Sequence, residues 1–224
     1  MQTEARVIDL SKSEYGTFAA PDTNRVIRNT YKLLALSTGV AAVGAGISML
    51  AGFGPLTGIV FTLLGLVPLF YLSKHRDSAS AVPAMLTFTG LSGLGLGPIL
   101  THYLSLPGGS ATVMTAAVLT TAVTLALTGY VHKTGKDFTR MGGFLFAGLI
   151  VVLLASIAAI FVPAMQAGVS AVAALLFSGF ILFDTSRLIR GEEDNYVMAA
   201  CSMYLNVLNL FLSILQLLGF SVDD

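Results

Sequence analysis

The amino-acid sequence predicts an all-α integral membrane protein with seven transmembrane helices. Hydrophobic residues make up 55% of the chain, charged residues only 11%, and the mean hydropathy is +0.82, which sets the chain apart from soluble domains. A spanning helix needs about 20 mainly apolar residues. Four runs free of Lys, Arg, Asp and Glu leave room for two, two, two and one spans in turn: residues 33–73, 78–132, 142–183 and 195–222. These runs are continuous and lack strict alternation, which favours helices over a β-barrel.

The placement of the basic residues predicts the orientation of these helices. An even number of crossings returns the chain to the side that it left, so the Lys and Arg clusters between the runs share one face. The short loops near residues 52–55, 106–109 and 162–168 carry no Lys or Arg. Because basic loops tend to stay on the cytoplasmic side, we expect a cytoplasmic N-terminus and a C-terminus outside.

Residues 1–30 are predicted to form a cytoplasmic N-terminal tail. They mix acidic and basic residues without the apolar core of a signal peptide, and a helix is expected near Asn24–Tyr31, where the chain enters the first span. The tail is either a solvated leader or a handle for a partner. The membrane domain is predicted to cover residues 31–220 and to leave a short external C-terminus at 221–224, with approximate spans at 31–51, 56–73, 82–103, 110–131, 142–162, 166–188 and 196–220.

Proline and glycine distinguish the second and third spans. Pro68 lies inside the second, and the third contains Gly90, Gly93, Gly97 and Pro98. Small residues allow the backbone of a neighbouring helix to approach closely, so these glycines predict a packing surface. Each proline removes a helical hydrogen bond and should kink or break its helix.

The fourth and fifth spans contain no strong candidates for functional residues. Thr120, Thr124 and Thr128 recur every four residues in the fourth span, and threonine hydroxyls can return to the backbone of their own helix, which favours a structural role. The fifth span is free of charge. Neither span predicts a site.

The sixth span contains a carboxylate near its inner end, which is unusual for a membrane helix. Asp184 lies about 9 Å of helix before the inner end near Arg190. Acids within the membrane are costly and mark functional sites by default. Arg187 follows at i+3 and could pair with Asp184 within the helix, and Asn206 on the next helix lies at a similar depth. A functional site and a structural ion pair both remain open. The acidic loop residues 192–194 are either solvated or attract cations.

The seventh span carries one polar stripe. Its members recur at spacings of three and four residues and are Ser202, Asn206, Asn209, Ser213 and Gln216. Amide side chains facing lipid would lose hydrogen bonds, so the stripe must face protein or a water-filled cleft. The other faces are also apolar, which predicts a central helix. Interhelical hydrogen bonding and a hydrated path are the two explanations of the stripe.

The sequence contains no pattern typical of an enzyme. It has no HExxH motif, no nucleophile constellation and three scattered His residues. We therefore expect no catalytic residues, no bound metal, no cofactor and no nucleic-acid partner, with the lipid bilayer as the surroundings. The single Cys201 lies inside the last span and is expected to be a small packing residue.

Four stretches occur in order along the chain: Arg28-Asn-Thr-Tyr31, Gly97-Pro98-Ile-Leu100, Ile181-Leu-Phe-Asp184-Thr-Ser186 and Met203-Tyr-Leu-Asn206-Val-Leu-Asn209. With them, the sequence from Arg25 onward resembles the Bax inhibitor-1 family of seven-helix membrane proteins, and especially its bacterial YccA-like branch. The resemblance implies a fold with helix seven at the centre and the other six packed around it.

The resemblance also implies two functions. In the family, acids on helices six and seven can share a proton and govern a pH-sensitive leak of calcium. Asp184 matches the first position, whereas Asn206 stands at the second, with Asn209 one turn further. Arg76 is the nearest match to an arginine that can contact the pair. The YccA-like branch is instead associated with binding the FtsH-type ATP-dependent membrane protease and moderating its attack on membrane proteins.

The incomplete acid pair favours the second implied function. We therefore predict a non-enzymatic modulator of an FtsH-type protease in the bacterial inner membrane. The alternative is a cation leak channel, with calcium ions or protons as partners.

Overall fold

The computed structural model describes residues 23–220, which form seven long helices and two short 3₁₀ helices, without a strand in that range. All seven long helices are long and apolar enough to cross a membrane, which confirms the predicted fold class. Residues 1–22 of the predicted N-terminal tail and the predicted external C-terminus at 221–224 lie outside the described residues. The elements are α1 (Thr23–Leu50), α2 (Pro55–Lys74), α3 (Ala81–Ser105), α4 (Gly109–Thr134), η2 (Thr139–Met141), α5 (Gly142–Phe161), η3 (Pro163–Met165), α6 (Gln166–Ile189) and α7 (Tyr196–Phe220).

The first helix starts ahead of the predicted span at residue 31. Its first turns are held by Val26, which is buried in a cluster with Leu188, Ala199 and Met203 from α6 and α7. Burial of such an apolar side chain stabilises the helix beyond the part that crosses the membrane. The expected helix near Asn24–Tyr31 is therefore confirmed, and it belongs to α1.

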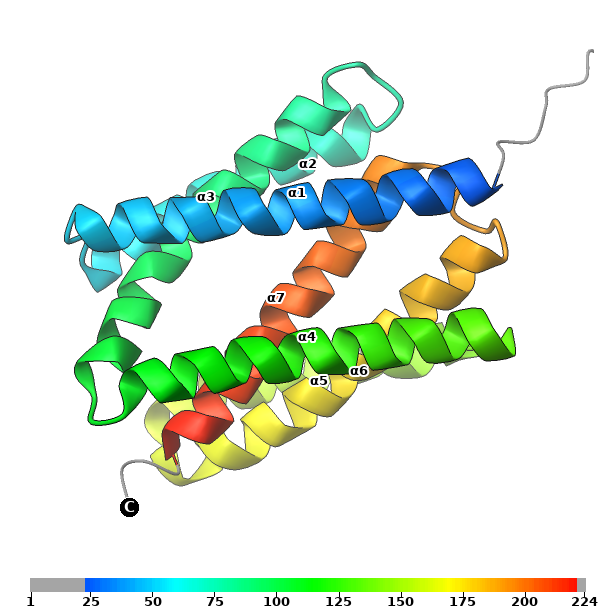
Figure 1. Cartoon of the computed structure of the whole chain (residues 1–224). Coiled ribbons are helices and arrows are strands. Elements are labelled where there is room, and N and C mark those ends of the chain that lie inside the picture. Colours follow the sequence, from blue (N-terminus) through cyan, green and yellow to red (C-terminus); the bar gives the residue numbers. More distant parts are fainter. Residues whose placement is uncertain (1–22, 221–224) are drawn as a thin grey trace, which may run out of the picture.

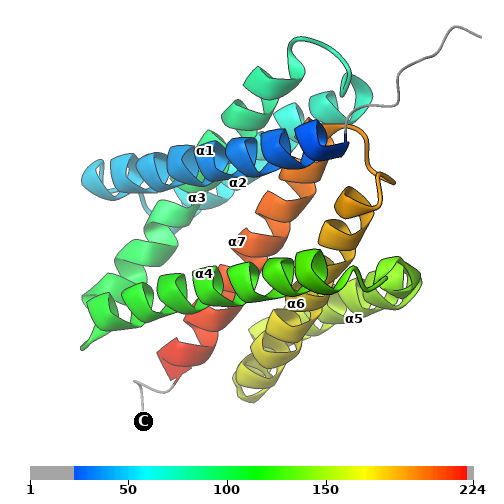
Figure 2. The same cartoon turned by 45° about the vertical axis from the view of Figure 1, so that its right-hand side comes forward.

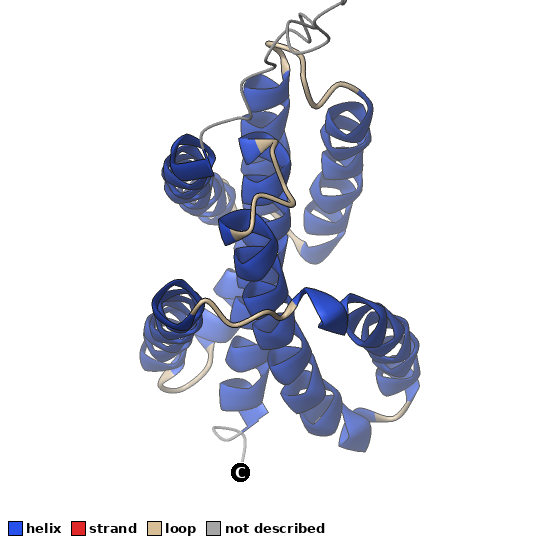
Figure 3. Ribbon diagram, turned by 90° about the vertical axis from the view of Figure 1, so that its right-hand side faces the viewer, coloured by secondary structure: helices blue, strands red, loops and turns tan. Residues whose placement is uncertain are grey.

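The helices form two groups with α7 between them (Figures 1 and 3). In one group α1 and α2 pack on α3, and in the other α4 and α5 pack on α6. Helix α7 contacts α1, α3, α4 and α6, while α2 and α5 form the outside of the bundle. Half of an 18-residue apolar stretch of α7 is buried, compared with 17% of such stretches in α2, α4 and α5. The polar stripe thus predicted the central helix correctly.

All connections that carry Lys or Arg lie at one end of the bundle, below called the basic end. It comprises the start of α1 and the α2–α3, α4–α5 and α6–α7 connections, at the right in Figures 1 and 2. The α1–α2 and α3–α4 loops and the end of α7 lie at the opposite end (Figure 1). The shared face of the basic clusters is therefore present, and its cytoplasmic orientation stays a prediction.

The glycines of α3 differ in how closely another helix approaches them. A Cβ atom at Gly93 would overlap the backbone carbonyl of Ala41 on α1, and one at Gly97 would overlap the side chain of Ser48. At Gly90 a Cβ atom would lie 3.6 Å from a methyl carbon of Val40, which is ordinary contact. Helix α3 continues through Pro98 to Ser105, so the proline does not break it.

The loop after α4 is fastened to the end of α6. The hydroxyl of Ser186 donates to the carbonyl of Lys136 (3.2 Å) and accepts from the backbone N–H of Phe138 (3.2 Å). The guanidinium of Arg190 lies 3.1 Å from the carboxylate of Asp137. These contacts join the second group of helices at the basic end.

The carboxyl of Asp137 should titrate at an unusually low pH. Hydrogen bonds from the hydroxyl (2.7 Å) and the backbone N–H (2.9 Å) of Thr139 lower its pKa below the ordinary 3.8, and Arg190 adds attraction. Since the folded-state pKa is lowered, the stabilisation is present above the ordinary value and is lost as the pH falls through the lower one. The amide proton of Thr139, followed by NMR, should titrate with a midpoint below 3.8, and Asp137→Asn should abolish that titration. A midpoint at or above the ordinary value would contradict this arrangement.

Candidate functional site

The most unusual polar group in the membrane domain is the carboxylate of Asp184 on α6. Its side chain is buried, and Thr185 and Ser186 beside it are fully buried. One oxygen, Oδ2, accepts hydrogen bonds from the hydroxyl of Ser202 (2.5 Å) and from the amide of Asn206 (2.7 Å) on α7. The structure thus brings Asp184 and Asn206 together, as their similar depth predicted.

The hairpin of α6 and α7 sets this geometry. The Asn195 side chain caps α7, because its oxygen accepts hydrogen bonds from the backbone N–H groups of Val197 and Met198 (both 3.0 Å). The cap fixes where α7 starts, and Ser202 and Asn206 follow on one face because they are four residues apart. Both therefore point at the same carboxylate. Sequence reasoning placed Ser202 in the stripe but missed it as a site residue, although its i−4 spacing from Asn206 was the available signal.

The rest of the stripe serves other partners. The oxygen of Gln216 accepts a hydrogen bond from Ser170 on α6 (2.6 Å), while Asn209 and Ser213 donate to carbonyls of α7 itself (2.8 and 2.7 Å). Asn209 therefore makes no hydrogen bond to Asp184. The stripe supplies interhelical hydrogen bonds at both ends of the hairpin, as the first of the two explanations predicted.

Two arginines considered as partners of Asp184 form their ion pairs with other carboxylates. Arg187 pairs with Glu193 in the α6–α7 loop (3.3 Å), because this loop turns back toward the last turn of α6. Arg76 lies in the α2–α3 connection with its side chain 53% exposed, and its ion pair is with Asp77 (3.6 Å). Neither arginine forms an ion pair with Asp184 among the described residues.

The site is therefore one carboxylate held by two neutral donors. Such donors satisfy a buried acid without offering a second group that can take its proton. The described residues contain no cluster of three His, Cys, Asp or Glu side chains that could hold a metal ion. The geometry allows Asp184 to lock α6 to α7, or to respond when a cation or proton reaches it.

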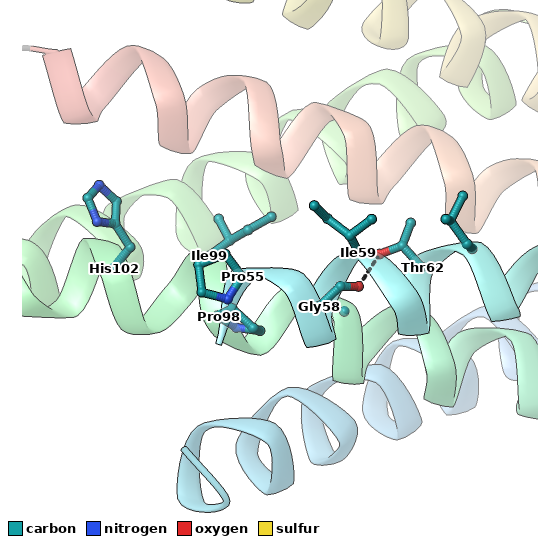
Figure 4. Close-up of a pocket in the computed structure, with 9 residues that line it drawn as sticks. Pro55, Gly58, Ile59, Thr62, Pro98, Ile99 and His102 are labelled. Carbon is teal, nitrogen blue, oxygen red and sulfur yellow. Dashed lines mark hydrogen bonds between the residues drawn. The ribbon is translucent and has the colours of Figure 1, made fainter. Parts of the chain in front are cut away.

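Two pockets of about 390 Å³ lie away from Asp184. The first is an apolar groove between α2 and α3, where Gly58, Thr62 and Pro98 line the wall and His102 stands at one end (Figure 4). The hydroxyl of Thr62 is satisfied by the carbonyl of Gly58 (3.0 Å). The second is a polar cleft at the basic end between the α2–α3 and α6–α7 connections, where Asn195 donates to the carbonyl of Arg76 (2.8 Å) and to Asp77 (2.9 Å).

Comparisons with known proteins give the following relatives. A family model described as "Inhibitor of apoptosis-promoting Bax1" matches residues 23–223. An uncharacterized membrane protein of Vibrio cholerae is 45% identical over 201 residues, which cover 88% of this chain and 90% of the relative. The Escherichia coli protein named "Modulator of FtsH protease YccA" is 40% identical over 205 residues, which cover 90% and 93%. The same alignment is found with an E. coli protein from another strain, named "Inner membrane protein YccA".

Proposed function

Because this chain belongs to the Bax inhibitor-1 family of membrane proteins, we propose that it binds an FtsH-type ATP-dependent membrane protease and moderates the degradation of membrane proteins. The chain is a multi-pass protein of a bacterial inner membrane, where such a protease also resides. The observation that carries the proposal is the 40% identity, over most of both chains, to a protein named as a modulator of FtsH protease.

The basic end offers a surface for this partner. The polar cleft beside Arg76, Asp77 and Asp194 lies at the end where the described chain enters α1. Arg76 is half exposed and Asp77 more so, and polar, exposed groups of both signs are typical of interfaces between transient partners. A protease with its soluble part on this side of the membrane could contact the cleft and the N-terminal tail together.

A pull-down in mild detergent from native membranes tests the proposal. The tagged chain should recover an FtsH-type protease in stoichiometric amount. Reversing charge in the cleft with Asp194→Lys should lower the recovery about tenfold, the equivalent of about 1.4 kcal/mol at a charged interface. Phe161→Ala is the control, because this side chain is 80% exposed and lies at the end of α5 away from the basic end. If both variants recover as much protease as the native chain, the cleft is not part of the interface. If the native chain recovers no protease, the proposal is contradicted.

A half-life measurement separates binding from modulation. Known membrane substrates of the protease should persist longer in cells that overproduce this chain, and a chain without residues 2–20 should itself be degraded more slowly if the tail is a handle. Unchanged substrate half-lives, with the protease shown to be active, would mean that the chain binds without moderating degradation.

The buried carboxylate favours a second candidate function. Asp184 lies beside the last turns of α6 and takes two hydrogen bonds from α7, so a change at this carboxylate would act on the packing of the central hairpin. We propose a cation leak as the alternative, with calcium or protons passing when this contact opens. Flux into liposomes that contain the purified chain tests this alternative independently of any protease.

A further inference from the structure

A lateral groove of about 400 Å³ lies between α1 and α4. Helix α7 forms its floor, as Figures 1 and 2 show where α7 crosses behind these two helices, and α3 contributes to one wall. Its lining includes Ala45 and Gly46 on α1, Leu100 on α3, Ala117 on α4, and Leu208 and Phe211 on α7. All of them lie on spanning helices, so the groove lies at the depth of the membrane.

The surface of the groove offers few polar groups to an occupant: Tyr204 also lines it, but the hydroxyl of Tyr204 is buried. No Lys, Arg, Asp, Glu or His side chain lines it. Its three threonines, Thr38, Thr120 and Thr121, each donate their hydroxyl to a carbonyl of their own helix (2.9, 2.7 and 2.9 Å). They therefore contribute mainly methyl groups, and the groove suits an uncharged, apolar occupant.

The groove is smaller than a transmembrane helix. The lining residues of α1 extend from Thr38 to Met49, a length of about 16 Å at the rise of an α-helix. A volume of about 400 Å³ is in the range of small-molecule sites, whereas a helix with its side chains is about 10–12 Å wide. A single hydrocarbon chain is the occupant that fits within the groove.

The groove also has a defined direction. Its residues come from the second half of α1 and the first half of α4, which are the halves away from the basic end. Nearer the basic end the two helices are linked by Tyr31 and His132, whose side chains form a hydrogen bond of 3.1 Å. The groove thus lies in the half of the helices that faces the leaflet opposite the basic end.

We propose that this groove binds one acyl chain of a phospholipid from the leaflet opposite the basic end. The chain fills the space between α1 and α4, which do not pack along each other in the described structure. An apolar void of this size would leave the lining side chains without contacts. Occupancy by hydrocarbon restores those contacts and holds the two groups of helices at a fixed separation.

Two glycines on α1 provide a matched test. A Cβ atom at Gly46 or at Gly39 would meet nothing within 4 Å, so the first carbon of a larger side chain has space at both positions, but only Gly46 lines the groove. In native mass spectrometry of the full chain purified in mild detergent, the native protein and Gly39→Leu should retain one phospholipid. Gly46→Leu should lose it, with at least about a tenfold weaker signal for the lipid-bound species. Equal retention by the two variants, or no retained phospholipid in the native protein, would overturn the proposal.

A second measurement does not depend on the folding of Gly46→Leu. The chain contains no Trp, so a single introduced indole reports one place. Phe211→Trp puts it in the groove, and Phe144→Trp puts it on the exposed surface of α5. With about one phospholipid per protein in detergent, brominated on its acyl chain, the fluorescence of Phe211→Trp should be quenched several-fold more. Equal quenching at both positions would overturn the proposal. A co-purified protein whose helix shields the indole of Phe211→Trp from the brominated acyl chain would also overturn it.

Discussion

Replacing Gly93 with alanine should separate α1 from α3 and destabilise the whole bundle. The added methyl carbon would overlap the carbonyl group of Ala41, which belongs to the backbone of α1 and cannot turn aside as a side chain can. Overpacking of this kind costs about 1–3 kcal/mol and more where the backbone must move. For a chain of this size we expect the melting temperature in detergent to fall by about 5–10 °C, measured by thermal unfolding of the purified protein.

Gly90→Ala is the matched control, on the same helix and less than one turn away. Its methyl carbon would lie 3.6 Å from Val40, so no rearrangement is needed. Alanine is also favoured over glycine within a helix by about 1 kcal/mol. This variant should therefore be as stable as the native protein or slightly more so. Equal stability of the Gly90 and Gly93 variants would show that α1 and α3 do not approach at Gly93.

Replacing Asn206 with aspartate should make the α6–α7 contact sensitive to pH. The native amide donates to Asp184 over 2.7 Å, whereas a second carboxylate there would face a like charge at that separation. Two such acids share one proton at low pH and repel each other after losing it. The proton is bound in the folded state, so the stability of Asn206→Asp relative to the native protein should fall as the pH rises. We expect a loss of about 2 kcal/mol between about pH 5 and pH 8, measured by thermal unfolding.

Calcium flux into liposomes tests the same change in the alternative function. The native site has no second acid to share a proton with Asp184, so any leak should depend less steeply on pH between about 6 and 8 than it does in a paired site. Asn206→Asp should steepen that dependence, and Asp184→Asn should flatten what remains. Ser202→Ala is the control for loss of one donor without a new charge, because its hydroxyl bonds to the same oxygen of Asp184. A steep response of the native protein that survives Asp184→Asn would place the sensor elsewhere.

The spans, their order and the shared face of the basic clusters could be predicted from the sequence. Each of these properties follows from the length of an uncharged run and from the cost of charge in lipid, and both are local. The central place of α7 could also be predicted, because amides such as Asn206 and Gln216 must find partners inside the protein. The same reasoning brought Asp184 and Asn206 together, since their distances from the hairpin loop are set by the rise of a helix.

Only the tertiary structure decided which neighbour each of these residues meets. Arg187 was expected at Asp184 by its spacing, but the path of the α6–α7 loop brings Glu193 to it. Arg76 lies in the α2–α3 connection and pairs with Asp77, and the structure adds Ser202 as a hydrogen-bond donor to Asp184. Gly90 and Gly93 look alike in sequence, yet of the two only Gly93 would place an added methyl carbon on the backbone of α1. Spacing along one helix is fixed by covalent geometry, whereas contact between helices depends on how they rotate and cross, which the packing of all seven determines together.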